Sequence, residues 1–304
     1  MTDQAAGLRE AVSTPAKGRP PLRVIAVTSG KGGVGKTHVS ANLAVLAAKA
    51  GRRVLLIDAD LGLANADIVL GVCPERHLGH LLDGSATTDE VLAAGPHGLR
   101  ILGASSGVQE LTALTDQQKL SLVQAFESAA AQFDLVIIDC AAGIGDNVVF
   151  FAGAAQEALL VVSPEPTSLS DAYATVKVLS QQAGVTAFSV VANQAADFQG
   201  RDVFRRLTQV TDRFLRAKLT YLGHVPRDEN LQRAIQVQQP VVDLFPRAPA
   251  SRALQVLADT LLASPAPASL QGGMKLFWQQ LLDERSPQPL PPGPPAVEAL
   301  APHP

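Results

Sequence analysis

Short apolar runs alternate with longer segments of helical periodicity over most of this chain. Most of the runs are continuous rather than alternating, which is typical of parallel strands covered on both faces. The expected strands are Arg23–Thr28, Val54–Asp58, Leu99–Gly103, Leu135–Asp139, Ala158–Ser163, Phe188–Ala192 and Tyr221–Val225. The expected helices are Lys36–Ala50, Asp116–Gln132, Ser168–Ala183, Arg201–Leu215, Glu229–Gln238 and Ser251–Leu262. This order predicts an α/β fold with a doubly wound, mostly parallel sheet and helices on both faces.

Both ends of the chain lack this alternation. Residues 1–20 are polar and contain several glycines and prolines, which predicts a flexible N-terminal tail. Residues 264–273 are rich in Ala, Pro, Ser and Gly and predict a linker, and 286–304 are rich in Pro and predict disorder. Between linker and tail, 274–285 predict an amphipathic helix, so the single folded domain is expected over 21–263.

A glycine-rich segment follows the first expected strand. Residues 30–37 read G-K-G-G-V-G-K-T and fit the phosphate-binding P-loop, G-x-x-x-x-G-K-[ST]. Glycines let backbone N–H groups approach phosphate oxygens, Lys36 supplies charge for the terminal phosphates, and the Thr37 hydroxyl can bind Mg²⁺. The alternative, a glycine turn without a ligand, does not explain a full motif between a strand and a helix. The predicted phosphate-binding residues are Gly30, Lys31, Gly32, Gly33, Val34, Gly35, Lys36, Thr37 and His38.

Lys31 distinguishes this loop from an ordinary P-loop, which needs only Lys36. A second lysine near the start of the loop indicates a nucleotide site completed by a neighbouring subunit. The loop therefore predicts a dimerising switch rather than a monomeric kinase.

Two expected strands end in aspartate, at Asp58 and Asp139. Both carboxylates should lie at the carboxyl edge of the sheet, where open α/β folds bind ligands. Asp139 is the better Mg²⁺-binding residue of a Walker B motif, because Gly143 follows closely and can serve a loop that senses the γ-phosphate. Asp60 lies just beyond the strand end and can orient a water for attack on that phosphate. Ordinary turn chemistry is the alternative for Asp58 and Asp60.

These motifs resemble those of the MinD/ParA ATPases. Residues 30–37 resemble their deviant Walker A loop, 58–65 their switch I and 139–143 their switch II. Residues 164–173 and 221–228 resemble the FlhG/FleN branch, which regulates flagellar number and placement. The resemblance covers about residues 22–263. Residues 3–9, D-Q-A-A-G-L-R, match the D-Q-A-x-x-L-R motif at the N-terminus of FlhG proteins.

The resemblance implies a slow, Mg²⁺-dependent ATPase that forms a homodimer with ATP and resets on hydrolysis to ADP. Lys31 would reach phosphates held by the other subunit, and the catalytic set would be Lys31, Lys36, Asp60 and Asp139. Thr37, Asp58 and Asp139 would hold the metal ion, and Asn193, Pro226 and Asp228 would contact the nucleotide on its adenine side. The preference for ATP rests on the resemblance, and the chain has no Asn-Lys-x-Asp guanine motif.

The resemblance also implies the partners. They are flagellar proteins, namely the GTPase FlhF, a transcription activator of the FleQ class and components of the C-ring. The residues expected to contact them are Asp3, Gln4, Ala5, Leu8 and Arg9.

The C-terminal helix carries one apolar stripe, formed by Met274, Phe277, Trp278, Leu281 and Leu282. The stripe predicts binding to a membrane surface, as at the C-terminus of MinD, although the few cations beside it give little attraction to anionic lipid. Docking onto the protein's own domain is the alternative. The predicted location is the cytoplasm, with nucleotide-dependent association with the inner membrane, including the cell pole.

Composition narrows the function further. The net charge of −3 and pI of about 6.1 argue against direct binding of nucleic acid. No apolar run is long enough to span a bilayer, and the two cysteines, Cys73 and Cys140, are expected to be buried or half-buried residues rather than ligands of an iron–sulfur cluster. Three rivals stay open: a ParA-like DNA-partition ATPase, a MinD-like division regulator, and a metabolic enzyme resembling dethiobiotin synthetase.

Overall fold

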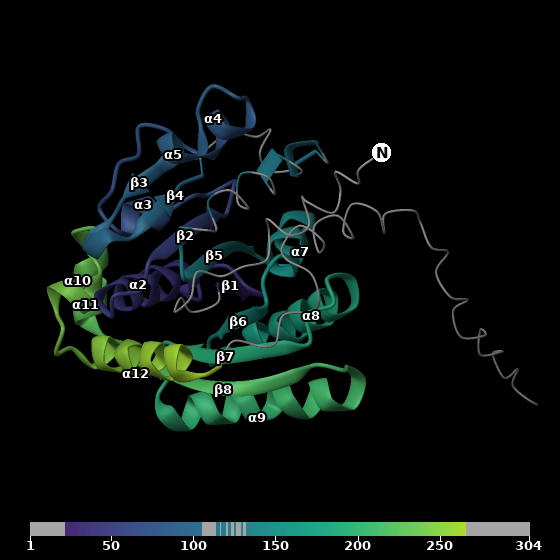
Figure 1. The fold of residues 1–304 in the computed structure, drawn as a ribbon. Helices are drawn as coiled ribbons and strands as arrows, with labels where there is room; N and C mark the ends of the chain where they lie inside the picture. Colours follow the sequence, from purple (N-terminus) through teal and green to yellow (C-terminus); the bar gives the residue numbers. More distant parts are fainter. Residues whose placement is uncertain are drawn as a thin grey trace, which may run out of the picture.

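One mixed sheet organises the protein in the computed structural model (Figure 1). The structure describes residues 22–104, 114–115, 117–119, 121–122, 125, 129 and 132–265. Within these ranges eight strands follow the order β3-β4-β2-β5-β1-β6-β7-β8. The expectations for residues 1–20 and 274–304, including the D-Q-A-A-G-L-R segment and the apolar stripe, lie outside the described residues.

Every expected strand is present, with ends shifted by at most a few residues. They are β1 (Arg23–Ser29), β2 (Val54–Ala59), β4 (Arg100–Leu102), β5 (Leu135–Ala142), β6 (Glu157–Val162), β7 (Ala187–Asn193) and β8 (Lys218–Val225). All of these pair in parallel. The sequence did not predict β3 (Leu92–Ala94), which pairs antiparallel to β4. Three residues are too few to show a strand period, so β3 depends on its partner strand.

The helices agree with the sequence where they are long. These are α2 (Lys36–Lys49), α8 (Pro166–Gln182), α9 (Asp197–Phe214), α10 (Glu229–Gln236) and α12 (Pro249–Ala263). The described residues of the segment expected at 116–132 include helical positions at 117–119, 121–122, 125 and 129. The elements not predicted are α3 (Ala66–Val69), α4 (Leu78–Leu82), α5 (Thr88–Val91), α7 (Asp146–Gly153), α11 (Val241–Leu244) and the 3₁₀ turn η1 (Pro96–Gly98).

Two of the unpredicted short helices, α4 and α5, begin with capping boxes. At α5, for example, the Glu90 carboxylate accepts hydrogen bonds from the backbone N–H and the hydroxyl of Thr87. A capping box satisfies backbone donors at the start of a helix and can fix a single turn. Such a turn contains too few residues to show helical periodicity.

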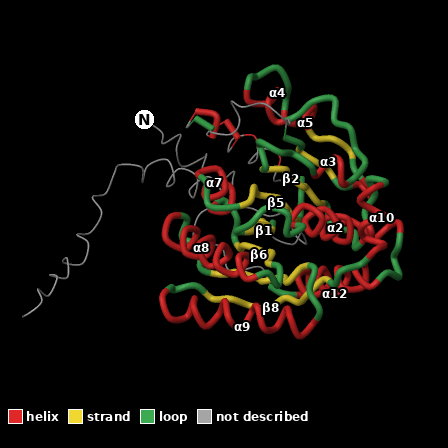
Figure 2. The backbone as a smooth tube through the Cα atoms, turned by 180° about the vertical axis from the view of Figure 1, so that it is seen from behind, coloured by secondary structure: helices red, strands yellow, loops and turns green. Residues whose placement is uncertain are grey.

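Helices cover both faces of the sheet (Figures 1 and 2). In β5, Val136 and Ile138 join the core beneath α7, α8 and α9, whereas Leu135 and Ile137 join the core beneath α2, α10, α11 and α12. Two buried faces explain why the strand is apolar without interruption from Leu135 to Ile138. The predicted doubly wound α/β fold is therefore confirmed.

Strand register brings the site residues together. Asp58 pairs with Asp139 across β2 and β5, and Ser29 at the end of β1 pairs with Ala142 of β5. The segments that follow β1, β2 and β5 therefore leave the sheet at the same edge, as parallel strands require.

The opposite edge of the sheet anchors the end of α12. Buried Arg23, the first residue of β1, forms an ion pair with Glu157 of β6, and its guanidinium donates to the carbonyls of Leu261 and Ser264. The end of α12 is thus fixed at the end of β1 that lies away from the P-loop. Among the described residues, no helix is both long and apolar enough to cross a membrane.

The expectation for the cysteines is only half right. Cys140 is buried, whereas Cys73 is exposed. Burial raises the pKa of the Cys140 thiol, so this side chain is a neutral core residue.

Candidate nucleotide-binding site

The P-loop joins β1 to α2 through two glycines in the left-handed region. Gly33 has φ 78° and Gly35 has φ 83°, and α2 begins at Lys36 directly after Gly35. Residues with a Cβ avoid this region, which explains glycine at both positions. The free N–H groups and the dipole at the start of α2 favour an anion in the loop.

Asn193, at the end of β7, fixes the P-loop from behind. Its Nδ2 donates to the carbonyl oxygen of Val34 over 2.7 Å, and the Asn193 side chain is buried. A Cβ at Gly35 would lie 2.3 Å from this Nδ2, so only glycine admits the contact. The loop is therefore held in shape by a strand residue that follows Val34 by 159 positions in the sequence.

The loop also packs against α8 at its first residue. A Cβ at Gly30 would lie 2.2 Å from the carbonyl carbon of Asp171 and 2.6 Å from the backbone nitrogen of Ala172. Neither backbone atom can move aside as a flexible side chain could, so Gly30 is required by this close approach.

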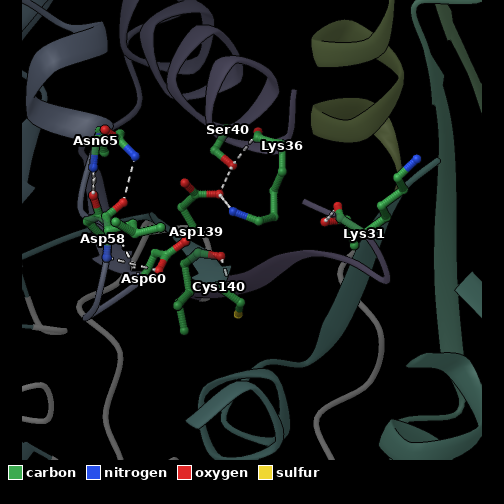
Figure 3. Close-up of polar contacts among 12 residues, drawn as sticks. Lys31, Lys36, Ser40, Asp58, Asp60, Asn65, Asp139 and Cys140 are labelled. Carbon is green, nitrogen blue, oxygen red and sulfur yellow. Dashed lines mark hydrogen bonds and ion pairs between the residues drawn. The ribbon is translucent and has the colours of Figure 1, made fainter. Parts of the chain in front are cut away.

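A buried ion pair lies beneath the loop. Lys36 Nζ lies 3.2 Å from Asp139 Oδ1, and the Ser40 hydroxyl donates to the same oxygen over 2.9 Å (Figure 3). Burial alone would lower the pKa of Lys36, but the charge and hydrogen bond of Asp139 outweigh it, and the net shift is upward. Lys36 is therefore a permanent cation at the place where the motif puts the terminal phosphates.

Asp58 organises the loop that follows β2. One of its oxygens accepts from the N–H of Asp60 (3.0 Å), and the other accepts from Asn65 (2.8 Å) and Ala66 (2.9 Å). Burial and the nearby charge of Asp139 raise the pKa of Asp58 to about 7, although the hydrogen bonds from these three N–H groups act to lower it. Asp58 thus fixes residues 60–66 to the strand end, where the sequence placed switch I.

Asp60 lies just beyond the end of β2, at the same edge of the sheet. It is half-buried, and Oδ1 accepts from the N–H of Leu63 over 3.3 Å. Burial raises the pKa of Asp60, and the positive charge of Lys36 partly offsets this. The side chain of Leu63 beside it is 72% exposed.

Gly143 connects the end of β5 to the P-loop strand. Its N–H donates to the carbonyl oxygen of Ser29 over 2.8 Å, and it adopts φ 94°. No heavy atom lies within 4 Å of a Cβ built there. The backbone angle, and not crowding, explains glycine at this position.

The oxygen atoms at this edge fit a magnesium ion bound with phosphate. Asp139 Oδ2 is buried and lacks a hydrogen-bond partner among the described residues. Thr37 follows Lys36 in the first turn of α2 and is half-buried. Mg²⁺ prefers one or two oxygen ligands from protein together with phosphate and water, which these residues can provide.

The remaining predicted nucleotide residues occupy different environments. Asp228 accepts from the N–H groups of Asn230 (2.8 Å) and Ala250 (2.9 Å), so it caps α10 and ties it to the start of α12. Pro226 follows β8 and is half-buried. Burial lowers the pKa of His38, opposed in part by Asp139. Contact of Asn193, Pro226 or Asp228 with adenine stays a prediction.

Lys31 forms contacts that the sequence did not indicate. Its Nζ lies 2.5 Å from Glu165 Oε2 and 3.2 Å from the hydroxyl of Thr167, both at the start of α8. Figure 3 shows its side chain extending away from the Lys36–Asp139 pair. Sequence reasoning also missed Ser40, although its position four residues after Lys36 places both on one helix face.

The chain is similar to known proteins of the family that the motifs indicated. The CobQ/CobB/MinD/ParA nucleotide-binding domain matches residues 25–241. The antiactivator FleN of Pseudomonas aeruginosa is 49% identical over 263 residues, which cover 86% of this chain and 94% of that protein. The flagellum site-determining protein YlxH of Helicobacter pylori is 31% identical over 265 residues, which cover 86% of this chain and 90% of that protein.

Solved structures of MinD share the fold. The septum site-determining protein MinD of Pyrococcus horikoshii, complexed with Mg-ADP, is 27% identical with a TM-score of 0.67, covering 82% of this chain and all of that one. MinD in the MinC:MinD complex of Aquifex aeolicus is 28% identical with a TM-score of 0.64, over the same shares. The resemblance inferred from the motifs is confirmed by these matches.

Proposed function

The chain belongs to the CobQ/CobB/MinD/ParA family of nucleotide-binding proteins, and we propose that it is an ATP-dependent dimerising switch that regulates flagellar number and placement. The observation that carries the proposal is the 49% identity to the antiactivator FleN over 94% of that protein. The likeness to YlxH, a flagellum site-determining protein, supports the same process.

The proposed reaction is slow hydrolysis of ATP to ADP and phosphate. Lys36 and the N–H groups at the start of α2 bind the phosphates. Thr37 would bind Mg²⁺ directly, and Asp58 and Asp139 would act on it through water. When bound, Mg²⁺ would neutralise charge on the phosphate oxygens. Asp60 orients the attacking water. Two observations support these roles: Asp139 Oδ2 is buried without a hydrogen-bond partner in the part of the chain that the structure describes, and half-buried Asp60 lies near the charge of Lys36.

ATP binding is proposed to complete a homodimer through Lys31, with Gly143 and its loop sensing the γ-phosphate. Lys31 is exposed enough to move, with 38% of its side chain accessible. The apolar side chains of Leu63 and Ile144, from the loops after β2 and β5, are 72% and 50% exposed. Exposed apolar residues beside a ligand site favour burial against a second surface.

The dimer is proposed to act on flagellar partners through the ends of the chain. Residues Asp3–Arg9 contact partners such as FlhF, a FleQ-class activator and C-ring components. The stripe from Met274 to Leu282 attaches the protein to the inner membrane in a nucleotide-dependent way. The partner assignment rests on the D-Q-A-A-G-L-R motif and on the likeness to FleN and YlxH. The membrane assignment rests on the apolar stripe and on its resemblance to the C-terminus of MinD.

Asp60→Ala tests the switch. With Mg²⁺ and ATP, we expect the variant to bind nucleotide, to lose hydrolysis and to elute as a dimer on sizing chromatography, because the water-orienting carboxylate is gone while the phosphate site is kept. Asp259→Asn is the matched control, since Asp259 lies on the exposed face of α12 near the end that Arg23 anchors. A protein that stays monomeric with saturating ATP, in both wild type and variant, would contradict the proposal.

A further inference from the structure

Lys31 is held inside its own subunit by the first turn of α8. We propose that the contact of Lys31 with Glu165 and Thr167, called the clasp, is a resting-state lock that ATP-dependent dimerisation has to break. The inference rests on the proposed function, because it concerns how readily Lys31 becomes available to a second subunit. It makes Glu165 a positioning residue for that lysine.

The electrostatics of α8 make Glu165 the essential member of the clasp. The N-terminus of a helix carries partial positive charge, which disfavours an ammonium group beside it. The first turn of α8 contains no acidic residue. The carboxylate of Glu165, the residue before this turn, accepts a hydrogen bond from Lys31 and does not cap the helix. Without Glu165, the neutral hydroxyl of Thr167 would be the one described side chain left to bind the Lys31 ammonium group.

Glu165 is suited to releasing Lys31. Its side chain is 53% exposed, so water can solvate the carboxylate when the lysine leaves. The hydrogen bond and charge of Lys31 lower the pKa of Glu165, and the charge of Arg227 adds to this effect. Arg227 therefore remains as a cationic neighbour after Lys31 has moved.

The backbone on both sides of the clasp is fixed, so opening it requires only side-chain rotation. Gly30 is pressed against the backbone of α8, and the Ser29 hydroxyl donates to the carbonyl of Lys31 over 3.0 Å. On the other side, the N–H of Ser168 donates to the carbonyl of Glu165, and its hydroxyl accepts from the N–H of Ser163. The clasp thus resists the movement of one flexible side chain while the P-loop keeps its shape.

The strength of the ion pair between Lys31 and Glu165 limits how much the clasp can change the dimerisation equilibrium. Exposed ion pairs change an equilibrium by a factor of at most about five. A lock of this strength does not prevent dimerisation. It raises the protein concentration at which the ATP-bound dimer forms.

Glu165→Gln tests the clasp in the full-length protein. Sedimentation velocity with Mg²⁺ and a non-hydrolysed ATP analogue gives the protein concentration at half-dimerisation. We expect Glu165→Gln to lower it roughly two- to five-fold, and Thr167→Val to lower it less, because the hydroxyl is neutral. Asp259→Asn removes the same charge from the far end of α12 and should leave it unchanged. Affinity of the monomer for a fluorescent ATP analogue should be equal in all four proteins.

A double variant and the behaviour of the wild type show whether the clasp, the proposed switch or both are wrong. The gain from Glu165→Gln should vanish when combined with Lys31→Ala, because no lysine is left to release. If Glu165→Gln leaves the concentration unchanged or raises it while wild type dimerises, the clasp is overturned and the proposed switch survives; a rise would mean that Glu165 aims Lys31 at the second subunit. If wild type itself stays monomeric with the analogue, the proposed function fails and the clasp fails with it.

Discussion

Asn193→Ala separates two roles that one side chain can have at the nucleotide site. The sequence assigned Asn193 to the adenine side, whereas the structure shows its Nδ2 bonded to the carbonyl oxygen of Val34 inside the P-loop. A brace of this kind acts on phosphate binding whatever base is attached. A base contact acts on ATP and leaves the bare phosphates unaffected.

The structure sets the expected magnitude. The bond is 2.7 Å long and buried, so its removal leaves the Val34 carbonyl without this donor at a cost of about 1–3 kcal/mol. Asn193 Oδ1 has no partner among the described residues, so truncation breaks no second bond that the structure shows. If the whole cost falls on the loop shape that binds phosphate, affinity falls by about 5- to 140-fold, since 1.4 kcal/mol corresponds to tenfold.

The assay compares two ligands, inorganic triphosphate and ATP, titrated with Mg²⁺ into wild type and variant. We expect Asn193→Ala to weaken both by the same factor. Gln194→Ala is the matched control, because its Nε2 lies 3.5 Å from the carbonyl of Gly33 at an exposed position and contributes little. The control should bind both ligands within about twofold of wild type.

One result would refute the reasoning. If Asn193→Ala binds triphosphate as well as wild type does and loses affinity for ATP alone, the Val34 bond does not govern phosphate binding. Asn193 would then act through the base, as the sequence suggested.

Two further predictions concern the carboxylates under the loop. Ser40→Ala should lower the free energy of unfolding by about 1.5–3 kcal/mol, measured by urea denaturation, because it removes a buried donor to Asp139. Ser180→Ala is the control, because the Ser180 hydroxyl is exposed and bonds to the Lys177 carbonyl; it should change the free energy of unfolding by less than about 0.5 kcal/mol. Equal effects of the two variants would contradict the role of Ser40. Asp58 has a pKa raised to about 7, above its unfolded value of about 3.9, so its contribution to stability is complete below the unfolded value and is lost as pH rises through about 7. The nucleotide-free protein should therefore lose stability between about pH 4 and 8 by an amount that Asp58→Asn removes; an unchanged slope in the variant would count against this.

The sequence predicted the sheet well where burial dictated the pattern. The strands flanking the site are buried on both faces, so their residues before Asp58 and Asp139 are apolar without a break, and β5 can be recognised from its sequence alone. The helices and the short strand between Asp60 and Gly98 were not predicted. Helices α3, α4 and α5 have four or five residues each, and α4 and α5 begin with capping boxes such as Thr87–Glu90. Periodicity cannot reveal an element of one turn.

The same division applies within the site. Lys36, Thr37, Asp58 and Asp139 could be identified because their chemistry requires fixed spacings within a loop or a fixed place at a strand end. Ser40 lies one turn beyond the motif, and its bond to Asp139 depends on how α2 faces β5. Asn193 shows what the sequence cannot predict: its place at the end of a strand could be inferred from the sequence, but its hydrogen bond to the Val34 carbonyl in the P-loop could not.

By itself, the sequence determined the α/β class, the phosphate loop and its two lysines, since backbone geometry and phosphate chemistry constrain neighbouring residues directly. Only the tertiary structure decided which side chains those residues meet. Glu165 follows Lys31 by 134 positions and Asn193 follows Val34 by 159, yet each pair is in contact. Nothing local fixes such pairs: they arise because parallel strands bring distant loops to one edge of the sheet, where packing at Gly30 and Gly35 sets their approach.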